Sequence, residues 1–435
     1  MKRTGFYVFV IALAFCCLFG ISVYSFWNPQ TVSTEENRAL TSMPVFDKET
    51  WFSGEFSQEA EDFFSDHVLY RSWSIACAQE FETLMARQSE LQIVSHDVDI
   101  GLDIAAVDPS AAADSGTASD GSTAANTTDS DDTTADEQQD YIILSDRILS
   151  LYRFDEADTW YYINTINACF NTVPDYINKY LILAPSRVAF EDAAYQKYSS
   201  DQKAAIDLVY DNTDSLVLTV DAYTPLSEQD RDETYFRTDH HWSQFGSYFA
   251  AKALFDIAGI DYVPIEDYDE YEAGTFLGFL YAQNKAAAVD LANYPDKLEY
   301  YLYDGINNNM TYYTLGDNGE YVEAQALMID PSRQGYYTFL ESSCVYSVID
   351  GSQHDGSCLL VVGDSYADAL CTWLAQSFEK VVVLDLFEFE EGRAGFVNMI
   401  RNMDVTDFLI INHVNNLEHV NFTAEIKNLT QDAEE

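Results

Sequence analysis

Three short, almost entirely apolar runs toward the carboxyl end of the chain constrain its fold most. They occupy residues 358–362, 381–386 (where Asp385 is the one exception) and 408–411. Strands that are apolar at every position are buried on both faces, as in a parallel sheet with helices on either side. Between the first two runs, apolar side chains recur at helical spacing, namely Leu370, Trp373, Leu374 and Phe378. Strands that alternate with helices predict an α/β fold with a doubly wound, mostly parallel sheet.

The same alternation is predicted to start at residue 141 and to continue for most of the chain. Further apolar runs predict strands near residues 141–144, 180–184 and 215–220. A helix is expected over residues 155–173, between the first two of these strands. We therefore expect one α/β domain over residues 141–425, followed by a short tail at 426–435.

The amino-terminal end has the features of a membrane anchor. Lys2 and Arg3 precede an uncharged run whose apolar centre covers residues 6–27. This centre is long enough to cross a bilayer as a helix and longer than the usual apolar core of a signal peptide. Because basic residues hold the short amino-terminal side in the cytoplasm, residues 1–30 are predicted to be a signal anchor. The chain would then be a single-pass protein of the cell membrane with its main domain outside the cytoplasm, and cleavage near residues 23–25 is the alternative.

Two segments of different composition follow this predicted anchor. Residues 31–100 are expected to form an extended connector and then a helical arm, because apolar residues recur at helical spacing between positions 56 and 85. Residues 101–140 are rich in Ala, Ser, Thr and Asp and contain almost no large apolar side chain. Such a segment buries too little surface to offset its ordering entropy, so we predict an acidic, disordered insertion.

Charge and cysteine content argue against several classes of protein. The formal net charge of −51 disfavours nucleic acid or anionic lipid as the main partner. None of the seven cysteines shows CxxC spacing, which argues against a zinc ribbon. The cysteines beyond the predicted anchor are odd in number, so they do not form a complete disulfide framework.

Residues 239–242 read Asp-His-His-Trp and bring an acid, two imidazoles and an indole into four consecutive positions. A carboxylate two residues before a histidine is able to reach Nδ1 of that ring, which fixes the tautomer and leaves Nε2 free to accept a proton. Asp239 and His241 have this spacing. Ser243 follows as a favourable N-cap and Gly259 as a stop, so the motif is predicted to lie in a loop just before a helix.

Two other interpretations of this motif remain open from the sequence. Asp239, His240 and His241 could ligate zinc or a similar ion, but adjacent histidines do not readily face one ion and no HxH or HExxH spacing accompanies them. The histidines could also satisfy only local hydrogen bonds within a loop. We predict acid–base chemistry and no metal.

A nucleophile for such a base is available in the Gly-Asp-Ser sequence at residues 363–365, where the first apolar run ends. Ligands bind at the carboxyl ends of strands in open α/β sheets, and the start of the following helix could stabilise an oxyanion. The alternative is that Ser365 only caps that helix, as Asp364 could do. Together, the two motifs predict a triad of Asp239, His241 and Ser365.

The block at residues 237–242, with Gly246 after it, resembles the DHHW protein family. That family is similar to the SGNH-hydrolase-like acetyltransferases that modify exported polysaccharides such as alginate. Further segments share the resemblance, namely residues 36–40 with Pro44, 63–71, 278–281, 363–365 and 410–415. The resemblance covers nearly all of the chain outside the insertion, and it implies an SGNH hydrolase-like fold in which the Asp-x-His element precedes the serine.

The resemblance implies that Ser365 is the nucleophile, His241 the general base and Asp239 the residue that orients it. It also implies an O-acyltransferase that needs no cofactor and acetylates a cell-surface or exported polysaccharide. A polytopic membrane-bound O-acyltransferase would be the partner that delivers the acetyl groups. Further substrate or oxyanion contacts are predicted at four positions, Tyr366, Trp242, Arg237 and Asn412.

One segment departs from the family pattern. Residues 339–343 lack the Gly-Gly-Asn that would follow Phe-Leu in relatives. If relatives take oxyanion donors from that stretch, Ser342 or Asn412 would replace them in this chain. Two functions other than acyl transfer also stay open. The fold could serve a non-catalytic glycan-binding or envelope scaffold protein, or the same triad could serve a polysaccharide O-deacetylase.

Overall fold

A computed structural model describes residues 140–431 except 308, 317–318, 341–343 and 419, and in addition residues 32–33, 38–39, 56, 63 and 92–94. The predicted anchor, and almost all of the predicted arm and insertion, lie outside the described residues, so those predictions stay untested. In the part of the chain that the structure describes, no helix is both long and apolar enough to cross a bilayer.

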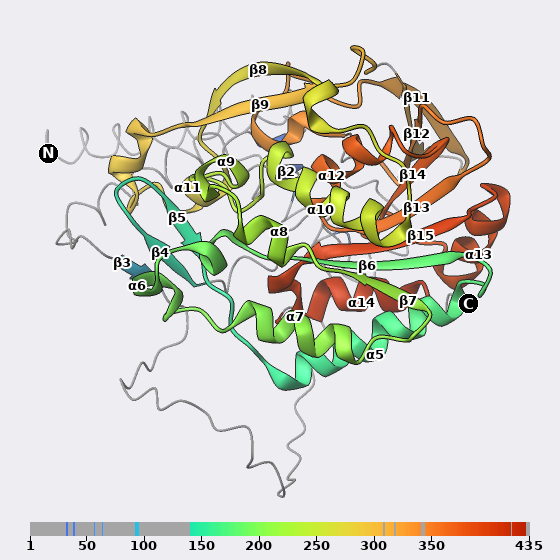
Figure 1. The fold of residues 1–435 in the computed structure, drawn as a ribbon, viewed down its shortest axis with the longest axis horizontal. Helices are drawn as coiled ribbons and strands as arrows, with labels where there is room; N and C mark the ends of the chain where they lie inside the picture. Colours follow the sequence, from blue (N-terminus) through green and yellow to red (C-terminus); the bar gives the residue numbers. More distant parts are fainter. Residues whose placement is uncertain are drawn as a thin grey trace, which may run out of the picture.

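The domain is built on an eight-stranded mixed sheet (Figure 1). In spatial order its strands are β11 (Tyr321–Ala326), β10 (Met310–Leu315), β12 (Tyr346–Asp350), β14 (Lys380–Asp385), β13 (Cys358–Gly363), β15 (Asp407–His413), β6 (Asn178–Ala184) and β7 (Val217–Val220). The strands from β14 to β7 in this order are parallel. β12, β10 and β11 extend the sheet with antiparallel pairing.

Helices cover both faces of this sheet (Figure 1). One face packs against α10 (Gln244–Ala258) and α12 (Tyr366–Leu374). The other packs against α5 (Glu156–Thr172), α7 (Gln202–Asp211), α13 (Gly392–Asn402) and α14 (Val420–Asn428). Successive residues of a central strand therefore enter two separate cores, as Val361 and Val362 of β13 do.

Smaller elements flank the main sheet. Two antiparallel sheets are formed by β8 (Asp269–Phe276) with β9 (Asp296–Leu302), and by β3 (Gln92–Val94), β4 (Tyr141–Ile143) and β5 (Ile148–Ser150). The short strands β1 (Val32–Ser33) and β2 (Arg38–Ala39) form a third. The connection from β8 to β9 contains α11 (Phe279–Gln283) and packs on β4 and β5.

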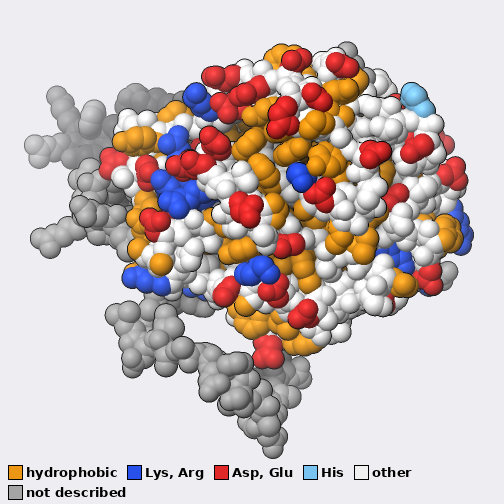
Figure 2. Space-filling view, in the orientation of Figure 1, with side chains coloured by type: hydrophobic (Ala, Val, Ile, Leu, Met, Phe, Trp, Pro, Cys, Tyr) orange, Lys and Arg blue, Asp and Glu red, His pale blue; other side chains and the backbone are white. Residues whose placement is uncertain are grey.

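Short helices complete the domain. They are α6 (Ala193–Gln196), α8 (Tyr223–Ser227) and α9 (Arg231–Thr234), and the 3-10 turns η2 (Arg187–Phe190), η3 (Ile265–Asp267), η4 (Val289–Asn293), η5 (Gly335–Thr338) and η6 (Val414–Leu417). On the face shown in Figure 2, acidic side chains are spread among apolar ones over much of the surface.

The predicted α/β fold with a mostly parallel sheet is confirmed, but the sheet is mixed. The apolar runs form β6, β13, β14 and β15. The edge strand β11 could not be recognised from apolar runs, because every one of its residues is at least partly exposed. A strand that buries neither face has no apolar signature in the sequence.

The start and end of α10 agree with the sequence prediction. The Ser243 hydroxyl accepts a hydrogen bond from the Gly246 amide at 3.0 Å, and Gly259 ends the helix in the left-handed conformation with φ of 69°. Gly246 is also required by packing, since a Cβ there would lie 2.2 Å from the carbonyl oxygen of Thr234. These contacts fix the helix that follows the histidine motif.

Replacing Ser243 by Ala is expected to lower the free energy of unfolding by about 1 kcal/mol, because the Gly246 amide loses its acceptor. Chemical denaturation of the full chain measures the effect. Lys252→Ala is the control on the same helix, since it removes an exposed ion pair with Asp256 and a distant contact with the Tyr262 ring, and it should change stability by less than about 0.5 kcal/mol. Equal effects of the two variants would contradict the assigned cap.

Candidate active site

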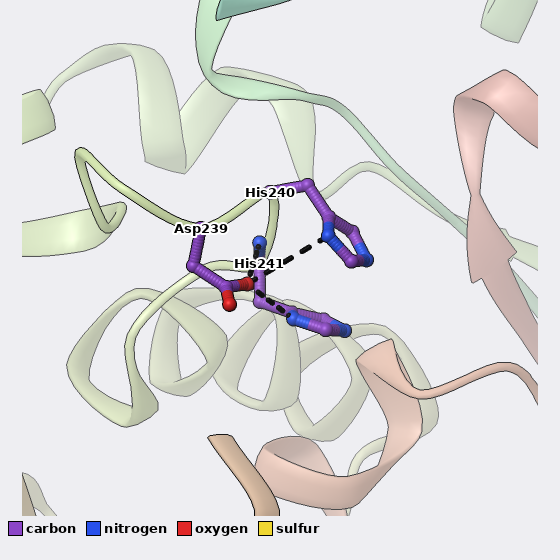
Figure 3. A group of neighbouring side chains, drawn as sticks. All are labelled: Asp239, His240 and His241. Carbon is purple, nitrogen blue, oxygen red and sulfur yellow. Dashed lines mark hydrogen bonds and ion pairs between the residues drawn. The ribbon is translucent and has the colours of Figure 1, made fainter. Parts of the chain in front are cut away.

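Asp239, His241 and Ser365 are joined by a chain of hydrogen bonds. His241 Nδ1 lies 2.6 Å from Asp239 Oδ1, and His241 Nε2 lies 2.6 Å from Ser365 Oγ. Figure 3 shows the Asp239 carboxylate facing the His241 ring, with the His240 ring close by. The backbone amide of His241 also donates to Asp239 Oδ1, at 3.1 Å. The structure therefore brings together the three residues that the sequence predicted as a triad.

Ser365 lies between β13 and α12, at the carboxyl end of a central strand. It is the N-cap residue of α12, but its side chain makes no capping hydrogen bond. Its hydroxyl contacts His241 instead. Gly363 allows the turn to pass close to the next strand, because a Cβ at that position would lie 2.6 Å from the carbonyl oxygen of Ile411. The capping interpretation of the Ser365 hydroxyl is therefore not supported.

Asp364 attaches this turn to the end of β15. Its Oδ1 accepts a hydrogen bond from the amide of Tyr366 at 3.0 Å. Its Oδ2 accepts from the amide of His413 at 2.6 Å and from Nδ2 of Asn416 at 2.7 Å. Because these donors come from two segments, the carboxylate fixes the position of Ser365 relative to the neighbouring strand.

Contacts between α10 and α12 hold the imidazole and the hydroxyl at one place. His241 lies just before α10, and Ser365 lies at the start of α12. Gln244 Nε2 donates to Thr372 Oγ1 at 2.7 Å, and Trp373 Nε1 donates to the carbonyl oxygen of Gln244 at 3.0 Å. All three side chains are buried, so these bonds are protected from competition with water.

The second oxygen of Asp239 is supported by the segment that begins α11. Oδ2 accepts a hydrogen bond from the amide of Phe279 at 2.9 Å. A Cβ on Gly278 would lie 2.4 Å from the same oxygen, so only glycine fits at this position. The Gly278 amide donates to Thr238 Oγ1 at 2.8 Å. The Gly-Phe-Leu-Tyr segment that the sequence shares with the family therefore supports the carboxylate.

A second buried aspartate, Asp296 at the start of β9, holds the backbone of the same loop. It accepts hydrogen bonds from the amide of Arg237 at 2.8 Å and from the amide of Thr238 at 2.7 Å. The Thr238 hydroxyl donates to it as well. Burial raises the pKa of Asp296, although these hydrogen bonds oppose the rise. The loop before Asp239 is thus fixed by a carboxylate distant in sequence.

Asp239 is buried, yet its pKa lies below the ordinary value. Burial by itself would raise this pKa, but the charge of His241 and its hydrogen bond, the charge of His240 and the amide of Phe279 together lower it. The carboxylate is therefore ionised at neutral pH. Because its folded-state pKa is lowered, its contribution to stability is present above the unfolded-state pKa and is lost as the pH falls through the folded-state pKa.

Both faces of the His241 imidazole carry another ring. The ring of Tyr336, in η5, is parallel to it, with centroids 3.7 Å apart and planes 2° apart. The ring of His240 lies with its centroid at 3.9 Å and is tilted by 35°. Two rings this close cannot occupy the same face, because aromatic rings are about 3.4–3.5 Å thick at van der Waals contact. Tyr336 and His240 therefore enclose the imidazole between them.

The metal interpretation can be examined in this geometry (Figure 3). Asp239, His240 and His241 offer ligand atoms that all lie within 4.8 Å of one another. Two ligands bound to one zinc ion in a tetrahedral site are about 3.3 Å apart. Asp239 Oδ1 and His241 Nδ1 are only 2.6 Å apart, which is a hydrogen-bond distance. The observed contact is that of an acid–imidazole pair.

Tyr366 and Trp242 lie beneath the triad and are almost fully buried. The Tyr366 hydroxyl donates to the carbonyl oxygen of His240, and the Tyr366 ring stacks on His413 with centroids 4.5 Å apart. Trp242 Nε1 donates to the carbonyl oxygen of Tyr366 at 3.2 Å. This burial disfavours the predicted substrate contacts of the two residues, and their contacts are those of supports for the histidine loop.

The other two predicted contacts differ in exposure. Arg237 keeps part of its side chain exposed, with Nε 3.7 Å from Asp296 Oδ1. Asn412 is fully buried; its Oδ1 accepts from the Tyr162 hydroxyl at 2.6 Å and its Nδ2 donates to the carbonyl oxygen of His413 at 3.0 Å. This geometry disfavours Asn412 as an oxyanion donor. Residues 341–343, the other predicted source of donors, lie outside the described residues.

Sequence reasoning missed Tyr336 and Asp296. Tyr336 is one of 30 tyrosines and Asp296 is one of 73 acidic residues, so neither stands out by composition. Neither belongs to a motif with a recognisable spacing. The only nearby signal was that Tyr336 precedes the 339–343 segment, which had been considered as a source of oxyanion donors.

Replacing Gly278 by Ala is expected to lower the free energy of unfolding by about 1–3 kcal/mol and to displace the Asp239 carboxylate, because the added Cβ overlaps its oxygen. Denaturation measures the first effect and a crystal structure of the variant the second. Leu277→Ala is the matched control, since Leu277 is exposed and its neighbour Gly278 is unchanged. An unchanged Asp239–His241 contact in a fully stable Gly278→Ala variant would contradict this role.

Comparison with solved structures agrees with this fold. A DHHW family protein from Eubacterium siraeum matches with a TM-score of 0.58 and 24% identity, over 68% of this chain and 96% of that chain. PatB1 from Bacillus cereus matches with a TM-score of 0.51 and 20% identity, over 64% of this chain and 97% of that chain. PatB1 with a sulfonyl adduct matches with a TM-score of 0.53 and 18% identity, over 68% of this chain and 98% of that chain. At these identities the similarity shows a common fold.

Sequence comparison gives the family. No curated protein matches the chain. The profile of the family described as DHHW protein matches residues 79–384, which is more than half of the chain and includes the histidine motif and Ser365. The chain therefore belongs to the DHHW protein family.

Proposed function

We propose that this protein is a membrane-anchored O-acyltransferase that acts outside the cytoplasm and acetylates a cell-surface or exported polysaccharide. The observation that carries the proposal is the pair of 2.6 Å contacts that link Ser365 to His241 and His241 to Asp239. The same arrangement of hydroxyl, imidazole and carboxylate activates serine for acyl transfer on unrelated folds. Membership of the DHHW family and the fold shared with PatB1 are consistent with it.

In the first step, Ser365 Oγ attacks the carbonyl carbon of an acyl donor while His241 Nε2 accepts the hydroxyl proton. The bond to the leaving group breaks, His241 returns the proton to that group, and the acyl group remains on Ser365 as an ester. In the second step, a sugar hydroxyl gives its proton to His241 and its oxygen attacks this ester. The sugar ester leaves, and Ser365 recovers its proton from His241.

Asp239 would hold the imidazole in the tautomer with its proton on Nδ1 and stabilise the imidazolium that forms in each step. Its lowered pKa supports this role, because the carboxylate is ionised at neutral pH. The oxyanion of each tetrahedral intermediate would lie near the start of α12, where the positive end of the helix dipole is favourable for negative charge. With the acetylated sugar as acyl donor and water as acceptor, the same site would be a deacetylase.

The remaining parts of the proposal depend on the sequence and the family resemblance. Residues 6–27 would anchor the domain at the outer face of the membrane, after the basic residues Lys2 and Arg3. A polytopic membrane-bound O-acyltransferase would supply acetyl groups across the bilayer. The site needs no cofactor for these steps, since the hydroxyl, the imidazole and the carboxylate perform them.

Labelling with an arylsulfonyl fluoride tests the nucleophile, and the sulfonyl adduct described for PatB1 supports the choice of probe. The natural protein is expected to form an adduct at Ser365, identified by mass spectrometry, and Ser365→Ala to form none there. His241→Ala should slow labelling by about a thousandfold or more, and Asp239→Asn by about a hundredfold to ten-thousandfold.

Ser227→Ala is the matched control, because Ser227 is an exposed serine of α8 and its loss should leave labelling unchanged. A Ser365 adduct that forms at the same rate without His241, or no adduct in the natural protein, would favour a non-catalytic glycan-binding or scaffold protein.

The O-acetyl content of the surface polysaccharide tests the direction of the reaction. In cells that produce Ser365→Ala at normal abundance, a transferase predicts less O-acetyl than in cells with the natural protein. A deacetylase predicts more, because the ester is no longer removed. Unchanged O-acetyl content would contradict both catalytic functions.

A further inference from the structure

The parallel contact between Tyr336 and His241 is unusually close for two side chains from separate loops. The ring centroids are 3.7 Å apart and the planes differ by 2°. Both residues are almost fully buried, with 5% of each exposed. The contact covers one whole face of the imidazole that links Asp239 to Ser365. Tyr336 therefore touches the group that accepts the proton.

The backbone around Tyr336 is built to hold the ring in this place. Gly335 has φ of 60°, a conformation that favours glycine, and a Cβ there would lie 2.9 Å from the Phe276 ring. The amide of Phe339 donates to the carbonyl oxygen of Tyr336 at 3.1 Å, and its ring packs edge-on against that of Tyr336 at 5.3 Å. An isolated bridge pairs Phe339 with Ile329. The segment has little freedom to move the tyrosine away.

Among the described residues, four side chains besides that of Tyr336 lie around the His241 imidazole. Asp239 contacts Nδ1 and Ser365 contacts Nε2. His240 covers the face opposite Tyr336, and the Tyr366 ring lies 5.2 Å away by centroids. Two further titratable groups lie around this cluster. The centroid of the His413 ring is 6.3 Å from that of the His240 ring. Asp368, which belongs to α12, lies near Tyr336.

We propose that Tyr336 is a positioning residue for the general base, whose ring fixes the plane of the His241 imidazole and stabilises it more strongly when it is protonated. The proposal rests on the proposed function of His241. A ring face carries negative partial charge, so it attracts a cation above it more than a neutral ring. The imidazolium exists only after His241 has taken the proton. Tyr336 would thus favour the charged intermediate state over the resting state.

The charge preference has a measurable consequence. A cation is attracted to an aromatic face by about 0.5–2 kcal/mol. This free energy corresponds to a shift of about 0.4–1.5 pH units in the midpoint of a titration. Removing the ring while keeping its volume should move the titration of His241 to lower pH by this amount. A residue that only fills space would not produce this shift when an apolar side chain of similar size replaces it.

The direct test follows the titration of His241 by NMR in the full chain, labelled with isotopes at histidine. The chain contains seven histidines, so seven ring signals have to be resolved. The resonance is assigned by its loss in His241→Gln. Tyr336→Leu is expected to lower the midpoint by about 0.4–1.5 pH units, and Tyr336→Phe to keep it within about 0.2 units of the natural protein. An unchanged midpoint in folded Tyr336→Leu would overturn the proposal.

Two further variants control for packing. Tyr337→Leu removes a partly exposed aromatic ring from the same segment without removing the ring that contacts His241, and it should leave the midpoint unchanged. If Tyr336→Leu does not fold, a ring-fluorinated phenylalanine in place of Tyr336 keeps the shape and weakens the negative face. Its midpoint should then be lower than that of Tyr336→Phe, and equal midpoints would overturn the proposal.

Labelling of Ser365 over a pH series separates this inference from the proposed function. Tyr336→Leu should shift the acidic limb of the profile to lower pH and slow the plateau rate, and Tyr336→Phe should restore both. Failure of the natural protein to label at Ser365 would reject the proposed function, while the NMR titration still decides the role of Tyr336. Normal labelling with an unshifted profile in Tyr336→Leu would reject the inference alone.

Discussion

The hydrogen bond between His241 Nε2 and Ser365 Oγ joins residues 124 positions apart, and much of the domain serves to place its two ends. Each end is attached to the start of a helix, and α10 and α12 are bonded to one another through Gln244, Thr372 and Trp373. Because both helices pack on the same face of the sheet, a movement of either loop would disturb a buried core. The contact therefore has the rigidity that proton transfer between two side chains requires.

Two buried aspartates, Asp239 and Asp296, and the partly buried Asp364 provide a second level of organisation. Asp239, Asp296 and Asp364 each accept hydrogen bonds from backbone amides of segments that would otherwise be independent. A buried carboxylate is costly unless it is fully hydrogen-bonded, so these groups stabilise one arrangement of the loops and penalise others. In a chain with a net charge of −51, few of its acids have this role, and their positions distinguish them.

Two kinds of feature in the site could be predicted: contacts between residues close together in the sequence, and residues that directly follow an apolar strand. Asp239 and His241 are two residues apart, so their contact depends on one turn of backbone, and Ser365 follows an apolar run that has to be a buried strand. Tyr336 and Asp296 could not be predicted in this way. Each reaches the loop from a distant segment, through packing that no spacing in the sequence records.

The sequence by itself determined the α/β class, the parallel core of the sheet, the cap and stop of α10, and the pairing of Asp239 with His241. These follow from apolar periodicity and short-range backbone geometry, which operate within one segment. Only the tertiary structure decided that the Ser365 hydroxyl faces His241 and does not cap its helix, and that Trp242, Tyr366 and Asn412 are buried supports. Those outcomes depend on which segments meet across the sheet. A side chain can bond only to groups that lie close to it in space, and the packing of distant elements decides which groups these are.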